Sequence, residues 1–77
     1  MDISRIRVPF RARPFTPFAI HTASGESFRV IGPETMAIDP EESVVIVMGP
    51  NAEVSFIDVA SITEVVMSMP APRPGGG

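Results

Sequence analysis

The chain has 77 residues, a net charge of −3 and no cysteine. A domain of this length buries only about 60% of the surface that its unfolded chain exposes, so its stability as a monomer is marginal. The lack of cysteine excludes disulfides, thiolate catalysis and cysteine-ligated zinc or iron–sulfur sites. Oligomerisation is the remaining common way to bury more surface. We therefore predict one small domain that forms a homo-oligomer.

Hydropathy argues against a membrane or secreted protein. The longest uninterrupted apolar run is 44–48, whereas a helix needs roughly 20 apolar residues to cross a bilayer. The N-terminus also lacks the apolar stretch of a signal peptide. We expect a cytoplasmic protein with no membrane partner.

Charge is distributed unevenly along the chain. Residues 1–13 carry four arginines against one acid, whereas residues 14–77 carry two arginines against eight acids. All basic residues are arginine, whose planar guanidinium pairs well with carboxylates and phosphates. This basic leader is the first candidate for partner binding, through Arg5, Arg7, Arg11 and Arg13.

Residues 1–17 are predicted to form a short helix and an Arg- and Pro-rich lead-in. The spacing of Ile3, Ile6 and Phe10 favours a helix over about residues 2–7. Pro9 ends or kinks that helix, because it lacks an N–H and clashes with the preceding turn. If the leader is extended, its four arginines lie on one side. They then bind an acidic partner or nucleic-acid phosphates, or they fold across the acidic body of this chain or a neighbouring one.

The next segment has the two-residue period of a β-hairpin. Phe18, Ile20 and Thr22 share one face, and after a turn at 24–26 the second strand points Phe28 and Val30 inward. We expect the lead-in to pack Phe15 and Phe18.

Further strands are predicted at 36–38, 44–48, 54–58 and 62–66. Turns separate them at 39–42 and 49–52, and a single tight turn occupies 58–61. The strand at 44–48 is apolar on both faces, so it is central in a sheet or lies against another subunit. Its Val45 and Val47 are predicted to form a contact face.

Together these elements predict a mainly β fold. Five to six short strands in residues 18–68, after an N-terminal helix, favour a meander curled into a small SH3-like or Sm-like barrel. A single turn before the last strand is typical of both barrels. Residues 69–77, rich in proline and glycine, are predicted to be a disordered tail.

The string Arg-Ala-Arg-Pro-Phe-Thr-Pro-Phe at 11–18, followed by Ile20, Gly25 and the strand at 28–30, resembles a family of small bacterial proteins of uncharacterised function. Those proteins pair an RARPFxPF lead-in with an Asp-Gly-Arg turn, a His-Pro-Glu step and a closing strand. The resemblance covers about residues 3–66. It implies a small β-barrel-like body and brings no activity with it. Here Ser-Gly-Glu replaces the turn at 24–26, and Gly-Pro-Glu replaces the step at 32–34.

Few residues suggest catalysis or a metal. His21 is the single histidine, and its neighbours on the same strand face are Ala19 and Ala23. The acidic turn at 39–42 does not match the ligand spacing of a calcium loop. No serine sits in a nucleophile elbow, and no glycine-rich loop precedes a helix. We therefore predict no enzyme activity, no catalytic residue, no metal and no cofactor.

The sequence favours a non-enzymatic protein-interaction or scaffold module of a bacterial cytoplasm that self-associates, with an unidentified protein partner. An Sm-like RNA binder is the main alternative, although the acidic body repels phosphate and has no Tyr or Trp on which bases could stack. A regulatory subunit that acts beside a larger partner is a third possibility.

Overall fold

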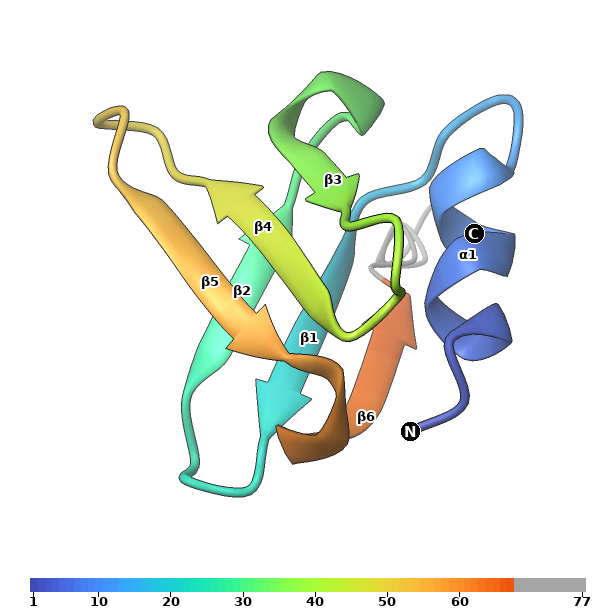
Figure 1. The fold of residues 1–77 in the computed structure, drawn as a ribbon. Coiled ribbons are helices and arrows are strands. Elements are labelled where there is room, and N and C mark those ends of the chain that lie inside the picture. Colours follow the sequence, from blue (N-terminus) through green and yellow to red (C-terminus); the bar gives the residue numbers. More distant parts are fainter. Residues whose placement is uncertain (68–77) are drawn as a thin grey trace, which may run out of the picture.

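The computed structural model describes residues 1–67, which form a helix and six antiparallel strands in two three-stranded sheets (Figure 1). Helix α1 covers Ser4–Arg11. The first sheet has the order β2-β1-β6, with bounds Ser27–Val30, Phe18–Thr22 and Ile62–Met67. The second has the order β3-β4-β5, with bounds Met36–Ile38, Val44–Met48 and Val54–Asp58.

The mainly β class with an N-terminal helix is therefore confirmed. No closed barrel is detected among the strands of residues 1–67. Residue 68 of the predicted body and the predicted tail at 69–77 lie outside the described residues.

The chain passes between the sheets twice, each time through a single 3-10 turn. Pro33–Thr35 carries it from β2 to β3, and Val59–Ser61 carries it from β5 back to β6. The second turn is the one predicted at 58–61. Its stabilising contact comes from the Ser61 hydroxyl, which donates to the Asp58 backbone carbonyl at 2.8 Å. The final strand therefore returns to the first sheet and pairs with β1.

One hydrophobic core joins the helix and both sheets. The predicted inward face of β1 is confirmed, since Phe18, Ile20 and Thr22 are all buried. The ring centroids of Phe15 and Phe18 lie 5.8 Å apart, so Phe15 of the lead-in packs against Phe18 of β1, as expected. The buried apolar residues are Ile6, Phe18, Ile20, Val30, Met36, Val45, Val47, Ile57, Val59 and Ile62.

Strand β4 is the central strand of its sheet, as the apolar run predicted. The prediction that Val45 and Val47 form a contact face, however, is wrong. Val45 is fully buried and Val47 almost so, because both side chains point into the core of their own monomer. They do not form an exposed contact face. The outward side of β4 carries Ile46 and Met48 instead.

Helix α1 is longer than predicted and continues through Pro9 to Arg11. Proline inside a helix costs about 3 kcal/mol, because one N–H is missing and the ring meets the preceding turn. Tertiary contacts offset that cost here. Pro9 is itself buried, Ile6 is fully buried, and Phe10 packs on the core from the same side. At the helix start, the Ser4 N–H donates to Asp2 Oδ1 at 3.0 Å.

Candidate protein-interaction surfaces

The structure separates the four arginines of the leader. Arg7 forms an ion pair with Glu42 in the turn that precedes β4. Arg13 bonds back to the end of α1, where its Nη1 donates to the backbone carbonyls of Phe10 at 3.2 Å and Ala12 at 2.7 Å. Arg5 and Arg11 are exposed on the helix. Two of the four guanidiniums therefore already make polar contacts within the chain.

This arrangement corrects the expectation of one arginine row. That expectation assumed an extended leader, whereas Arg5, Arg7 and Arg11 all lie on α1. Residues two apart on a helix point about 200° away from each other around the axis. Arg5 accordingly lies beside β6 and Arg7 beside the 39–42 turn, on opposite flanks of the buried side.

The acidic turn at 39–42 is stabilised by hydrogen bonds to Asp39 and contacts α1 through Glu42. Oxygens of the Asp39 carboxylate accept hydrogen bonds from the backbone N–H groups of Glu41, Ser43 and Val44, at 3.3, 2.7 and 2.8 Å. These bonds, that from Val44 first, hold the pKa of Asp39 below its ordinary value, because they stabilise the charged form. Glu42 adopts a φ of 59°, and its carboxylate meets Arg7.

His21 lies half-buried on β1, where its cross-strand neighbours are Ser27 and Glu64. Its backbone carbonyl accepts a hydrogen bond from the Thr63 hydroxyl at 3.3 Å. Within residues 1–67, no group of three His, Asp or Glu side chains is placed to hold a metal ion. None of the helices described there is long and apolar enough to cross a membrane.

An apolar patch covers the outward side of the second sheet. We call it the outer apolar face, and it consists of Ile46, Met48, Val54 and Phe56. Cross-strand pairing brings its members together, because Ile46 pairs with Phe56 and Met48 pairs with Val54. Phe56 is 72% exposed, and Met48 and Val54 are each 48% exposed. Exposed apolar side chains gathered in this way mark interaction surfaces more often than scattered ones do.

The apolar run at 44–48 indicates an outward face, but the prediction that Val45 and Val47 form it is wrong, because these two side chains are buried. An apolar run on both faces of β4 does not show which face its own sheet packs inward. The alternation in β5 resolves the question, because Ile57 is buried and Phe56 is exposed. The register of β4 on β5 then places Val45 inward, opposite Ile57.

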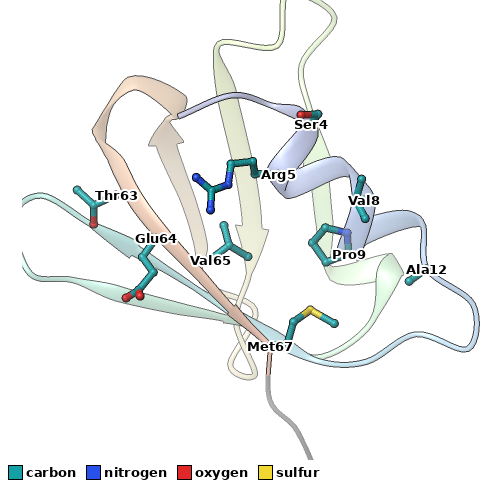
Figure 2. Close-up of a pocket in the computed structure, with 9 residues that line it drawn as sticks. All are labelled: Ser4, Arg5, Val8, Pro9, Ala12, Thr63, Glu64, Val65 and Met67. Carbon is teal, nitrogen blue, oxygen red and sulfur yellow. The ribbon is translucent and has the colours of Figure 1, made fainter.

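A second candidate surface is the groove between α1 and β6, which we call the α1–β6 groove (Figure 2). Its volume is about 720 Å³. Arg5 extends from the helix toward β6 at the end where Thr63 and Glu64 lie. Val8, Ala12 and Met67 line the other end. The groove thus has one polar end and one apolar end.

Comparison of the chain with protein-family models, with curated proteins and with solved structures finds no match. The resemblance to the RARPFxPF proteins therefore stays a prediction.

Proposed function

We propose that this chain is a non-enzymatic protein-interaction module that self-associates through the outer apolar face. The observation that carries the proposal is the cross-strand set of exposed Met48, Val54 and Phe56 with half-buried Ile46 on one side of a sheet. A further part of the proposal is that the two sheets are the halves of an SH3-like or Sm-like small barrel. The contact between β2 and β4 and the 3-10 turn before β6 support that topology.

The chemistry of the face favours a second copy of the chain as its partner. A two-fold interface sets each patch against its own copy, so any charge within it would meet a like charge. None of the four side chains carries a charge, and the exposed Asp58 on the same side lies at the end of β5. Burying them also adds apolar area to a domain whose own core is small and lacks disulfides.

Sedimentation velocity on Phe56→Lys tests this proposal. We expect the wild-type chain to sediment as a dimer or larger at about 100 µM, and Phe56→Lys to sediment as a monomer, because a lysine there meets its own copy. Circular dichroism should show an unchanged fold, since Phe56 is exposed. The matched control is Ile31→Lys, which changes an exposed residue outside the face and should leave the assembly intact.

If the wild-type chain stays monomeric at that concentration, it does not self-associate as proposed. If Phe56→Lys and Ile31→Lys dissociate the assembly equally, the outer apolar face is not its interface. The RNA-binding alternative is examined on the same samples by a gel-shift titration with poly-uridine RNA. Phosphate-driven binding weakens steeply as salt rises. Such a shift at low salt, with the protein monomeric throughout, would favour the RNA binder over the present proposal.

A further inference from the structure

We propose that the α1–β6 groove takes an extended segment of a partner protein, which adds as a strand to the free edge of β6 and sets a carboxylate against Arg5. The inference rests on the proposed role as an interaction module. It uses a surface other than the outer apolar face, so either surface can fail its test without the other.

The first argument is the edge of β6. The strand Ile62–Met67 ends the order β2-β1-β6 and pairs with β1 along one side. Within residues 1–67, no strand pairs with its other side. An edge of this kind presents backbone N–H and C=O groups that another extended chain can bond. Only a polypeptide carries both groups at strand spacing, so the edge selects a peptide over a nucleic acid.

The second argument is the groove beside that edge. Val8 and Pro9 of α1, with Ala12 just after the helix, form one wall, and Val65 and Met67 of β6 form the other. Val8 is 71% exposed although it belongs to an apolar wall. The volume of about 720 Å³ falls in the range of about 300–1,000 Å³ in which protein sites hold their ligands. A strand seated on β6 can therefore bury alternate apolar side chains against the helix.

The third argument is charge. Within residues 1–67, the one ion pair is that of Arg7 with Glu42, so the Arg5 guanidinium has no carboxylate within ion-pair distance there. Arg5 lies at the polar end of the groove, with Glu64 on the β6 side (Figure 2). A bound segment with an acidic residue beside Arg5 and none beside Glu64 complements both charges. A phosphate backbone instead meets the carboxylate of Glu64 and the apolar wall.

The experiment uses the full chain and a panel of fluorescein-labelled peptides of about ten residues, long enough to span the strand. Val or Ile alternates with Thr in each peptide, and the charged position is scanned along it as Asp, Ser or Lys. Fluorescence anisotropy measures binding, and backbone amide shifts of ¹⁵N-labelled protein locate it. We expect the best Asp peptide to bind with a dissociation constant of about 10–100 µM. The amide shifts should be concentrated in β6 and α1.

Two matched charge reversals test the role of Arg5. Arg5→Glu should weaken the best Asp peptide about tenfold and should favour its Lys counterpart. Arg11→Glu makes the same change on the same helix outside the groove, and should change affinity less than about twofold. A peptide with proline at every second position lacks the N–H groups that pair with the edge, and it should not bind.

Equal binding of the proline peptide overturns strand addition, and equal loss in the two arginine variants overturns the role of Arg5. The proposal is also wrong if no peptide of the panel binds at millimolar concentration, or if poly-uridine RNA produces the β6 shifts instead. Sedimentation of Arg5→Glu is run in parallel. If Arg5→Glu loses peptide binding but still assembles, the substitution acts on the α1–β6 groove and leaves the contact through the outer apolar face intact.

Discussion

At the scale of single residues, Asp39 shows how a half-buried carboxylate organises a turn. Its oxygens receive three backbone N–H groups from the loop that leads into β4. The same loop presents Glu42 to Arg7, so Asp39 indirectly positions the partner of the helix. The aspartate at the start of this acidic turn therefore has a structural role.

Asp39→Asn should lower the melting temperature at pH 7, because the amide carries no charge and has one acceptor oxygen. That oxygen can replace Oδ1, which accepts from Ser43 and Val44, but the NH2 group cannot accept from the Glu41 N–H as Oδ2 does. The folded pKa of Asp39 lies below its ordinary value of 3.8, so the charged form contributes stability above about pH 4. That stability is lost as pH falls from there through the lowered folded pKa. Thermal melts from pH 7 to pH 2 should show the difference between variant and wild type shrinking over that window. Glu41→Gln is the control, and a difference independent of pH contradicts the charge effect.

At the scale of elements, α1 depends on tertiary packing more than on local propensity. It has eight residues with a proline inside, and isolated helices of this length are unstable in water. Ile6 is fully buried in the common core, and Arg7 in the middle of the helix pairs with Glu42 of the 39–42 turn. Arg13 donates to backbone carbonyls at the C-terminal end of the helix. The helix therefore forms only when the sheets are in place.

Ile6→Ala should accordingly lower the free energy of unfolding by about 2–5 kcal/mol, because it leaves a cavity in the core. Urea denaturation followed by circular dichroism measures the change. Val8→Ala, on the exposed side of the same helix, should change stability by about 0.5 kcal/mol or less. Comparable losses in both variants contradict the view that a single buried side chain holds the helix.

At the scale of the whole molecule, one side of β4 packs in the core and the other lies on the surface. Val45 belongs to the core that joins both sheets, whereas Ile46 belongs to the outer apolar face. Neighbouring positions on one strand should therefore respond differently to the same charge. Folding depends on the first side, and the proposed assembly depends on the second.

Val45→Lys should unfold the chain, because an unpaired buried charge costs about 3–5 kcal/mol, a large part of the stability of a small domain. Ile46→Lys should leave a folded protein that no longer assembles. Circular dichroism and sedimentation on the pair distinguish the two results. A folded, monomeric Val45→Lys protein would instead place Val45 in an interface between copies of the chain.

Most of the secondary structure follows from local features of the sequence. The two-residue period from Phe18, the turn residues and the β-branched strand at 44–48 predicted the strands and the central place of β4, because these features act over a few residues. Packing between the elements sets which side of β4 is buried, how far α1 runs past Pro9 and where each arginine lies. Those outcomes depend on contacts between segments distant in sequence, such as Ile57 opposite Val45 and Glu42 beside Arg7, and no local pattern records them.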